Sequence, residues 1–285
     1  MSADPSDTTM TRTDVVVDGA RVAVFELGDG EPCLLLHGYP QDHRCWRRVA
    51  PDLAQTHRII APDWFGWGRS ERSLTLAPRF DAEVERLDRL LDELGLRQVN
   101  LFGHDYGGLL ALGLARRSPS RIRRLALINT RAHCAIAEPW SSILATMTWF
   151  ARVPGLHSAL TRMPNAWIHA RWLERYVAKG CFTRDEVESY VGWMREPGGR
   201  RWLAHFYRHF RVDARSELAA GPPVNVPIAA IWGDRDRYFP YSIAVDLARA
   251  FPRAEVTRVV GADHYVLEER PAEVVAALRA LLART

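Results

Sequence analysis

Short strand-like runs that alternate with segments of helical periodicity constrain the fold of this chain more than any other feature. Six runs have the pattern of strands in a sheet interior, and they cover residues 33–36, 58–63, 99–102, 125–128, 228–232 and 255–260. Apolar residues at helical spacing occur at residues 84–94, 109–117 and 271–282. Strands that alternate with helices form mostly parallel sheets with helices on both faces. The sequence therefore predicts an α/β fold with a mostly parallel central sheet flanked by helices.

The alternation stops in the middle of the chain. Residues 131–221 show mainly helical patterning and contain six of the ten tryptophans. A set of breakers, Gly221-Pro-Pro-Val-Asn-Val-Pro227, closes this segment before strand patterning resumes. We therefore expect a helical cap at 131–221, inserted into a core formed by residues 14–130 and 222–285.

The N-terminal segment combines a polar stretch with a hairpin pattern. Residues 15–25 read as two strands that turn at Asp18-Gly19, a pair typical of tight hairpins. Residues 1–13 are rich in Ser, Thr and Asp and lack the pattern of a secretory signal. We expect them to form a mobile tail.

Composition excludes several classes of protein. Of the 285 residues, 47% are hydrophobic and 25% are charged, as in globular proteins, and no run approaches the roughly 18 apolar residues of a membrane span. The net charge of +4 comes from arginines interspersed with acidic residues, which favours a mixed surface over a nucleic-acid interface. The four cysteines lack metal-ligand spacing. We expect a cytoplasmic protein, a monomer or homodimer, with a small-molecule substrate.

One strand-to-helix turn carries the strongest chemical signal. Gly103-His-Asp-Tyr-Gly-Gly108 follows an apolar run and precedes a helical segment. Glycines on both sides permit a sharp turn that lifts the central side chain towards a cleft, the context of the G-x-S-x-G nucleophile elbow. Here Asp105 replaces the serine. An aspartate can also simply cap the following helix, so the motif needs support from elsewhere in the chain.

Further polar segments follow other predicted strands. Gly233-Asp-Arg-Asp236 follows the run at 228–232, and Gly261-Ala-Asp-His264 follows the run at 255–260. Nucleophile, acid and histidine in this chain order match the α/β-hydrolase triad. His37-Gly-Tyr-Pro40 follows an early strand, where backbone N–H groups could form an oxyanion hole.

With these landmarks in order, the chain resembles the α/β-hydrolase superfamily over nearly its whole length. The helical insertion matches the cap of that family after the sixth strand, and residues 63–70 resemble its D-x-x-G-x-G-x-S turn. The resemblance implies a triad of Asp105, His264 and Asp236. It implies an oxyanion hole from the backbone N–H groups of Tyr39 and Tyr106.

An aspartate nucleophile selects the chemistry. A carboxylate with a reference pKa of about 4 is ionised at neutral pH and suits displacement at a saturated carbon that bears a leaving group. The product is an ester on Asp105, which water activated by His264 and oriented through Asp236 hydrolyses. This cycle needs no metal and no cofactor.

Epoxide opening and carbon–halogen hydrolysis both fit such an elbow. An epoxide oxygen needs a proton donor, whereas a halide needs only weak N–H donors. His37-Gly-Tyr-Pro40 is similar to the H-G-x-P motif of epoxide hydrolases, and Tyr106 stands where haloalkane dehalogenases usually carry tryptophan. Members of the epoxide hydrolase family place two donors in the cap, and the resemblance implies Tyr207 and Trp149 for these roles.

The sequence thus favours an epoxide hydrolase that forms a vicinal diol, with an apolar or aromatic epoxide as substrate. Two alternatives stay open. A haloalkane dehalogenase would use the same triad, and halide release would identify it. A ligand-binding protein on a hydrolase scaffold would also use an aromatic cap, although it would not require a filled triad.

Overall fold

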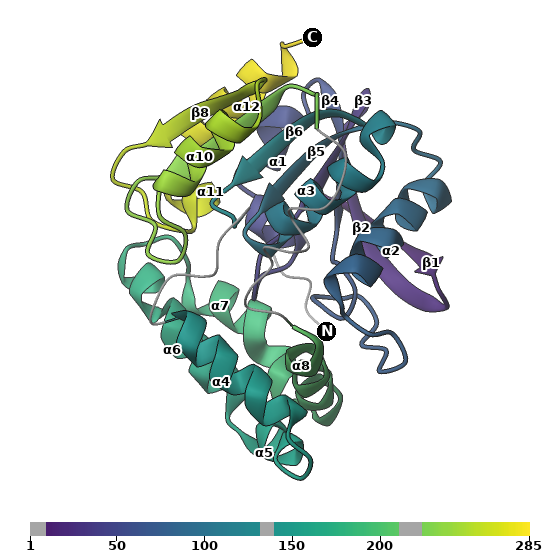
Figure 1. The fold of residues 1–285 in the computed structure, drawn as a ribbon, viewed down its shortest axis with the longest axis vertical. Coiled ribbons are helices and arrows are strands. Elements are labelled where there is room, and N and C mark those ends of the chain that lie inside the picture. The colour runs from purple at the N-terminus through teal and green to yellow at the C-terminus, as the bar shows by residue number, and fades with distance from the viewer. Residues whose placement is uncertain (1–9, 132–139, 211–223) are drawn as a thin grey trace.

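The computed structural model describes residues 10–131, 140–210 and 224–285. Its centre is an eight-stranded sheet with the order β1-β2-β4-β3-β5-β6-β7-β8 (Figure 1). The strands are Thr11–Val17, Ala20–Leu27, Glu31–Leu36, His57–Pro62, Val99–His104, Ile122–Ile128, Ile228–Gly233 and Ala254–Val259 for β1 to β8. Pairing is antiparallel for β1–β2 and β2–β4 and parallel from β4 across to β8. The predicted mostly parallel sheet is confirmed.

Helices cover both faces of this sheet, because successive strand side chains point to opposite faces. In β3, Leu34 and Leu36 face one buried cluster, and Cys33 and Leu35 face the other. The first face is covered by α2 (Phe80–Glu93), α3 (Tyr106–Arg117) and α10 (Ser242–Ala250). The second is covered by α1 (Ala50–Leu53), α11 (Val266–Glu269) and α12 (Pro271–Leu282). The predicted helical segments therefore flank the sheet.

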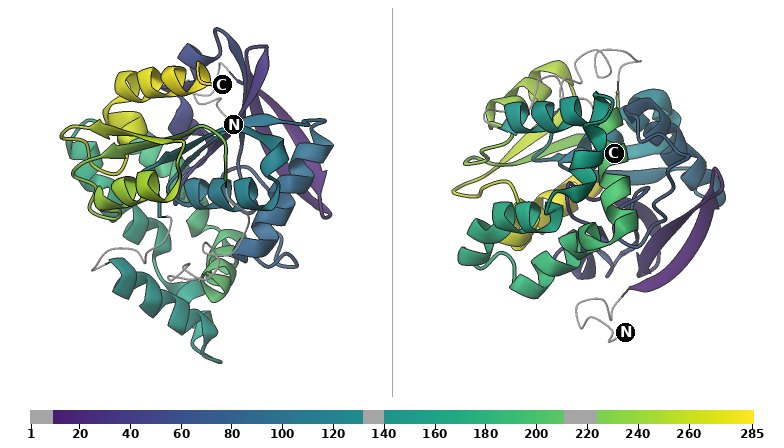
Figure 2. Two further views of the ribbon diagram at one scale, coloured as in Figure 1. Left: turned by 45° about the horizontal axis from the view of Figure 1, so that its top comes forward. Right: turned by 90° about the horizontal axis from the view of Figure 1, so that it is seen from below.

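A group of helices that follows β6 forms a separate layer. It comprises α4 (Trp140–Arg152), α5 (His157–Arg162), α6 (Asn165–Ala178), α7 (Arg184–Val191) and α8 (Pro197–His209), and the chain then returns to β7. Figures 1 and 2 show these helices, coloured teal to green, together on one side of the sheet. Both ends of the cap expected at 131–221 fall at segments outside the described residues, so we keep those boundaries as a proposal.

Ion pairs join this cap to the core. Asp263 directly precedes His264 in the chain. Its carboxylate lies 3.2 Å from Nη2 of Arg175, on α6, and 3.1 Å from Nζ of Lys179, the first residue after α6. Arg47 Nη2 lies 2.6 Å from Glu186 Oε1 on α7. Asp263 is only 3% exposed, and partly buried ion pairs are less screened by solvent than surface pairs. These contacts position α6 over the loop that carries His264.

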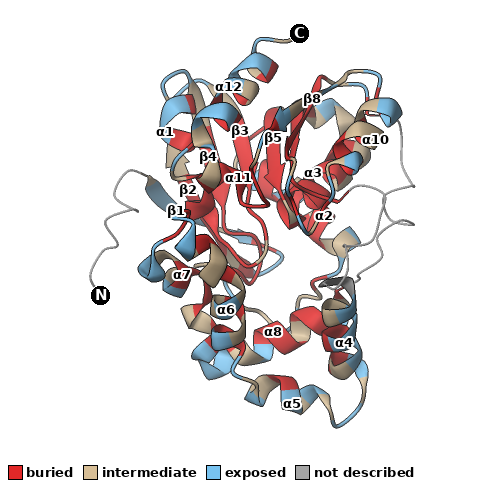
Figure 3. Cartoon of the chain, turned by 90° about the vertical axis from the view of Figure 1, so that its left-hand side faces the viewer, coloured by how far each residue is buried: buried red, intermediate tan, exposed pale blue. Residues whose placement is uncertain are grey.

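The N-terminal prediction needs a correction. The hairpin turn at Asp18-Gly19 is present, with φ of 52° and 78°. However, β1 begins at Thr11, so residues 11–13 belong to a strand and not to the tail that was expected over residues 1–13. Residues 1–9 lie outside the described part of the chain. Most side chains of β1 are exposed, and backbone pairing with β2 holds the strand in place. Because an exposed edge strand needs few apolar residues, its polar sequence did not indicate a strand. Figure 3 shows that burial is concentrated instead in the central strands.

Among the residues that the structure describes, no helix combines the length and apolar character needed to cross a bilayer.

Candidate active site

Asp105 occupies a strained turn between β5 and α3. Its φ of 51° and ψ of −120° lie in a region that L-residues rarely adopt, and such strain is concentrated at functional sites. The turn is fixed by backbone donation from Asp105 to Ile128 at 3.1 Å and by the Thr130 hydroxyl, which donates to the Asp105 carbonyl at 2.5 Å. A Cβ at Gly38 would lie 2.6 Å from the Asp105 Cβ. Glycine at 38 therefore lets the two loops approach each other.

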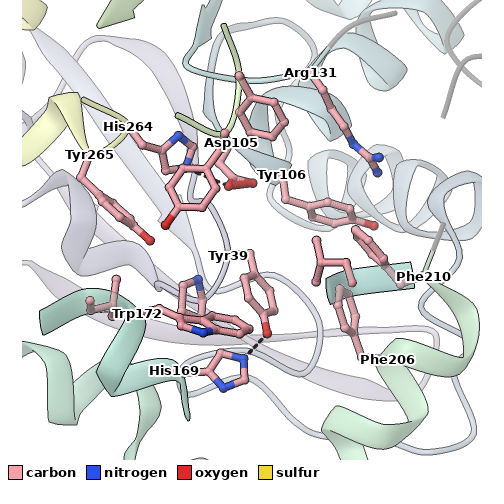
Figure 4. Close-up of a pocket in the computed structure, with 15 residues that line it drawn as sticks. Tyr39, Asp105, Tyr106, Arg131, His169, Trp172, Phe206, Phe210, His264 and Tyr265 are labelled. Carbon is pink, nitrogen blue, oxygen red and sulfur yellow. Dashed lines mark hydrogen bonds and ion pairs between the residues drawn. The ribbon is translucent and has the colours of Figure 1, made fainter. Parts of the chain in front are cut away.

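The three residues of the predicted triad lie in hydrogen-bonding contact. His264 Nε2 is 3.1 Å from Asp105 Oδ2, and His264 Nδ1 is 3.0 Å from Asp236 Oδ2. His264 is 2% exposed, and Asp105 faces a cavity beside it (Figure 4). Asp234 is the other aspartate of the Gly233-Asp-Arg-Asp236 motif. Its carboxylate lies at the surface and accepts from Arg258 and from the Gly261 N–H. These distances suit the roles of nucleophile, base and acid that we continue to propose for Asp105, His264 and Asp236.

Asn129 is a residue of this site whose role sequence reasoning missed. Its side-chain amide donates to Asp236 Oδ2 at 2.6 Å, and its side-chain oxygen accepts from Gly233 N at 3.1 Å. The other carboxylate oxygen of Asp236 accepts from the backbone N–H groups of Tyr238 and Phe239 at 2.8 and 3.0 Å. Asn129 directly follows β6, and it orients Asp236, which follows the neighbouring strand β7.

The charge state of His264 follows from these partners. Burial alone would lower its pKa, but the negative charge of Asp236 and hydrogen bonds to Asp105 and Asp236 outweigh burial and raise the pKa to about 10. In the resting protein both ring nitrogens therefore donate, one to each carboxylate. His104, directly before Asp105, has a pKa lowered to about 4 by burial, and its Nε2 donates to the His264 carbonyl at 2.9 Å.

The loop after β3 brings its backbone against the elbow. His37 Nε2 accepts from Trp64 N at 3.3 Å, and Trp64 Nε1 donates to the His37 carbonyl at 3.0 Å. The peptide bond between Tyr39 and Pro40 is cis. Tyr106 is the first residue of α3, where N–H groups lack intrahelical acceptors and favour negative charge. Tyr39 and Tyr106 both line the cavity at Asp105, which suits the oxyanion-hole role that we continue to propose.

The cavity is small and mostly aromatic. Its volume is about 80 Å³. It is lined by Tyr39, Pro40, Asp105, Tyr106, Arg131, Leu144, His169, Trp172, Leu173, Phe206, Phe210, Tyr238, Phe239, His264 and Tyr265. Core loops supply the triad side, and cap helices α4, α6 and α8 supply the opposite side. A substrate carbon at Asp105 would thus be enclosed by both layers.

A hydrogen-bonded cluster of Tyr39, His169 and Tyr207 faces the triad across this cavity. The Tyr39 hydroxyl contacts His169 Nε2 and lies 2.6 Å from the Tyr207 hydroxyl (Figure 4 marks the first contact). His169 Nδ1 donates to the Asn165 carbonyl at 2.6 Å, and burial lowers the pKa of His169 to about 4. His169 is therefore neutral, and its Nε2 accepts a hydrogen bond from the Tyr39 hydroxyl. Tyr207, expected to act on the leaving group directly, is not among the described lining residues and contacts the cavity through Tyr39.

Trp149 is not brought to the cavity. It is 56% exposed on α4 and packs edge-on against Phe150. The inward face of α4 consists of Leu144, Met147 and Ala151, which recur at helical spacing, and Leu144 reaches the cavity. The indole expected to serve as a second donor lies off this face. His169, which the sequence analysis did not single out, lines the cavity from the cap side, where a second cap residue was expected.

Two aspartates and one histidine lie close enough together to offer ligand atoms to a metal ion, but hydrogen bonds and ion pairs already occupy these side chains. Within the described residues this cluster comprises Asp42, His43 and Asp63. Asp63 Oδ1 accepts from His43 N and Nδ1, both at 2.8 Å, and Asp42 is paired with Arg44. These contacts organise the turn at residues 63–70, and the proposed reaction uses none of them.

A buried carboxyl supports Tyr106 from behind. The Tyr106 hydroxyl donates to Glu83 Oε2 at 2.5 Å, and burial raises the pKa of Glu83 to about 7. The unfolded chain would ionise this group near pH 4.5. The stability that Glu83 provides is thus fully present below pH 4.5 and is lost as pH rises through about 7.

A Glu83→Gln variant is expected to lack this component of the pH dependence, because glutamine keeps an acceptor for Tyr106 and does not ionise. Its free energy of unfolding relative to wild type should rise by on the order of 3 kcal/mol between pH 4.5 and pH 8. Urea titrations at both pH values measure this. Glu93→Gln, at the exposed end of α2, is the control. An equal loss of stability in wild type and Glu83→Gln would contradict the assignment.

Comparisons with known proteins identify the family of this fold. A family model described as the α/β hydrolase fold matches residues 31–271. The chain is 30% identical to a cis-3-alkyl-4-alkyloxetan-2-one decarboxylase of Xanthomonas campestris pv. campestris, over 90% of this chain and 89% of that protein. It is 27% identical to a soluble epoxide hydrolase of Corynebacterium sp. (strain C12), over 94% of this chain and 96% of that protein.

A solved structure described as epoxide hydrolase CorEH without ligand has the same fold. The TM-score is 0.78 at 24% identity, with 96% of this chain and 99% of that chain covered. The residues matched by the family model include the elbow and both other triad positions. The chain belongs to the α/β-hydrolase family.

Proposed function

We propose that this protein hydrolyses an epoxide to a vicinal diol through a covalent ester on Asp105. The observation that carries the proposal is the placement of Asp105 at a strained elbow, 3.1 Å from His264, in a cavity whose opposite wall presents the Tyr39 hydroxyl. A nucleophile and an O–H donor on opposite sides of one small cavity suit a ring that must be attacked at carbon while its oxygen is protonated. The relative from Corynebacterium supports the same class of substrate.

In the first step, a carboxylate oxygen of Asp105 attacks one epoxide carbon and the carbon–oxygen bond of the ring breaks. The released oxygen takes the proton of Tyr39, whose O–H turns from His169 Nε2 to the epoxide oxygen when the substrate is bound. Tyr207 donates to the Tyr39 oxygen and stabilises the phenolate that forms, because its hydroxyl lies 2.6 Å away. Burial raises the pKa of Tyr39 well above its usual value, so Tyr39 stays protonated until the ring oxygen develops the negative charge that takes its proton.

In the second step, His264 changes from acid to base. Both Asp105 and Asp236 raise the pKa of His264 in the resting protein. Esterification removes the charge of Asp105, so the pKa of His264 falls. The proton that His264 releases restores Tyr39. Neutral His264 then takes a proton from water, which attacks the ester carbonyl carbon of Asp105. Attack of water forms a tetrahedral intermediate. Its collapse releases the diol and regenerates the Asp105 carboxylate, while His264 stays protonated and Asp236 stabilises the imidazolium.

The donors on the cavity wall favour an epoxide over a halide. Tyr39, Tyr238 and Tyr265 bring hydroxyl groups to the lining, and among described lining residues Trp172 is the only indole. A halide leaves without a proton and would not require the Tyr39–Tyr207 pair. Haloalkane hydrolysis is the second reaction that this triad could perform, and halide release from bromoalkanes tests for it.

Tyr39→Phe is expected to slow ester formation from an epoxide by about 10² to 10⁴-fold, because the leaving oxygen loses its proton donor. Tyr207→Phe should have a smaller effect in the same direction. Stopped-flow measurement of single turnovers reports this step, and Tyr241→Phe, outside the cavity, is the control. An unchanged rate in the Tyr39→Phe/Tyr207→Phe double variant would contradict the proposed donor pair.

The similarity to the Xanthomonas decarboxylase favours one further candidate substrate with a strained ring, an oxetan-2-one. Attack of Asp105 on ring carbon 4 would break its bond to the ring oxygen and leave a carboxylate. Loss of CO₂ would form the alkene while the ester bond electrons return to Asp105. This sequence uses no water, so a His264→Ala variant would retain it and would lose epoxide hydrolysis. Carbon dioxide release by that variant would favour the lactone, and its absence would favour the epoxide.

A further inference from the structure

A second cavity adjoins the one at Asp105, between the core and the cap. Its volume is about 370 Å³. It is lined by Pro78, Arg79, Phe80, Asp81, Tyr106, Leu109, Arg131, Arg152, Arg208, His209 and Phe210. The core contributes the start of α2 and the first turn of α3, and the cap contributes the ends of α4 and α8. Tyr106, Arg131 and Phe210 line both cavities, so the two spaces share a wall.

The lining of this second cavity is strongly basic. It contains four arginines and one histidine, whereas Asp81 is the only acidic residue among the described lining residues. Among the described lining residues, four arginines less one aspartate give a formal charge of +3. Asp81 pairs with Arg79 at 3.1 Å, and both side chains are more than 60% exposed, so this pair lies at the outer rim. A concentration of one sign of charge in a recess attracts ligands of the opposite sign.

Arg131 lies where the two cavities meet. It is 4% exposed, and its guanidinium carbon is 5.3 Å from the centre of the Phe210 ring. Figure 4 shows Arg131 and Phe210 on the same side of Asp105 as Tyr106, away from Tyr265. Arginine presents a planar set of donors that matches the two oxygens of a carboxylate. A ligand that extends past Tyr106 would therefore meet positive charge on leaving the aromatic cavity.

The size of the first cavity requires such an extension for most substrates. Sites for small molecules usually measure about 300–1,000 Å³, and the cavity at Asp105 offers about 80 Å³. The second cavity, with about 370 Å³, adjoins the first across Tyr106, Arg131 and Phe210 and offers the missing space. The reacting carbon fits the first cavity, and the remainder of the molecule fits the second.

We propose that the arginine-lined cavity binds a carboxylate at the far end of the substrate. The inference rests on the proposed function and narrows it: the substrate class is an epoxide of a carboxylic acid, with an apolar segment that passes Tyr106 and Phe210. Arg131 contacts the acid from the shared wall, and Arg208 contacts it from the cap. Arg152, which donates to the carbonyls of Arg208 and Phe210, adds positive charge beside them. The reaction that supplies this substrate is thus an epoxidation of an unsaturated acid.

Binding of unreactive ligands tests the inference without turnover. The probes are ω-phenylalkanoates with chains of four to eight carbons and the matching primary amides, measured by calorimetry on wild-type protein. At least one carboxylate is expected to bind about tenfold more tightly than its amide, because only the acid pairs its charge with an arginine. This preference should shrink as salt is added, because the cavity is open to solvent at its rim. Equal binding of acid and amide across the series would overturn the inference.

Variants assign the preference to this cavity. Arg131→Gln and Arg208→Gln are expected to remove most of the preference for the carboxylate and to leave binding of the amides unchanged. Arg201→Gln, exposed on the same helix as Arg208 and outside the cavity, is the matched control. If Arg131→Gln fails to fold, Arg208→Gln alone decides, since its side chain is exposed. A carboxylate preference that persists in Arg208→Gln and Arg152→Gln would overturn the assignment.

Failure of this inference and failure of the proposed function are distinguishable. Hydrolysis of neutral epoxides together with equal binding of acids and amides would overturn the carboxylate site and leave the reaction in place. Carboxylate-selective binding with no epoxide opening, even for epoxy acids, would overturn the reaction and leave the anion site in place.

Discussion

An Asp105→Asn variant is expected to lose epoxide turnover by about 10⁴ to 10⁶-fold, the range seen when the nucleophile of a triad is removed. An amide oxygen is a poor nucleophile, so the first ester cannot form. Asparagine tolerates a positive φ better than most residues, and φ at this turn is 51°, so the fold should be retained. Initial rates of diol formation, with the melting temperature as a check on folding, measure the effect.

The matched control for this experiment is Asp234→Asn. Asp234 lies in the motif that supplies Asp236, but its carboxylate binds Arg258 at the surface. It should keep turnover within a few-fold of wild type. Mass measurement must exclude deamidation of the introduced asparagine back to aspartate. Full initial activity in undeamidated Asp105→Asn protein would rule out Asp105 as the nucleophile.

Substitution of His264 by alanine is expected to stop the reaction after the ester forms. Asp105 and the Tyr39–Tyr207 pair remain, so one equivalent of epoxide per protein should be consumed quickly. Turnover should then fall by about 10⁴-fold or more, because nothing activates water near the ester. Quenched-flow measurement of epoxide consumption shows the single equivalent, and His157→Ala, on α5 away from the cavity, is the control. Continued turnover at the wild-type rate would contradict the role of His264 as base.

The pH dependence of ester hydrolysis should report the same residue. In the ester form His264 must be neutral to accept a proton from water, so hydrolysis slows as pH falls below its pKa in that state. In the resting protein the pKa of His264 is about 10, since burial is outweighed by Asp236 and by hydrogen bonds to both carboxylates. The ester form should titrate lower because Asp105 has lost its charge. Rapid-quench rates of ester decay from pH 5 to pH 9 measure this pKa, and a rate that does not vary over this range would contradict the assignment.

Much of the catalytic framework was predictable because it depends on local backbone geometry. The turn around Asp105 requires glycines at fixed positions, and His264 and Asp236 follow strands whose order is fixed by a parallel sheet. Since the carboxyl ends of neighbouring parallel strands meet at one edge, residues that follow these strands converge. The structure places His264 within 3.1 Å of both aspartates, as this reasoning requires.

The cap side of the site was less predictable, because it depends on which face of each helix is buried. Trp149 and Leu144 lie on one helix, yet only Leu144 reaches the cavity. His169 is neutral and buried between α6 and the core, and its partner Tyr39 lies 130 residues away in the chain. No local pattern reveals such a pair. The inward spacing of Leu144, Met147 and Ala151 was readable in the sequence and could have placed Trp149 outside.

Asn129 illustrates a different limit of sequence reasoning. Asn129 directly follows β6, and its amide side chain matches no catalytic motif. Its function is evident only when Asp236 from the neighbouring strand lies 2.6 Å from its side chain. A residue that orients another group carries no motif of its own, so its role emerges from the assembled site.

The mass of one peptide tests the central claim most directly. Trypsin releases residues 98–116, in which Asp105 is the only acidic side chain. After His264→Ala protein is mixed with a panel of neutral and carboxylated epoxides, this peptide should gain the mass of one whole epoxide, and Asp105→Asn/His264→Ala protein should gain nothing. Diol formation without any mass gain on this peptide, or with a gain on another peptide instead, would contradict an ester on Asp105.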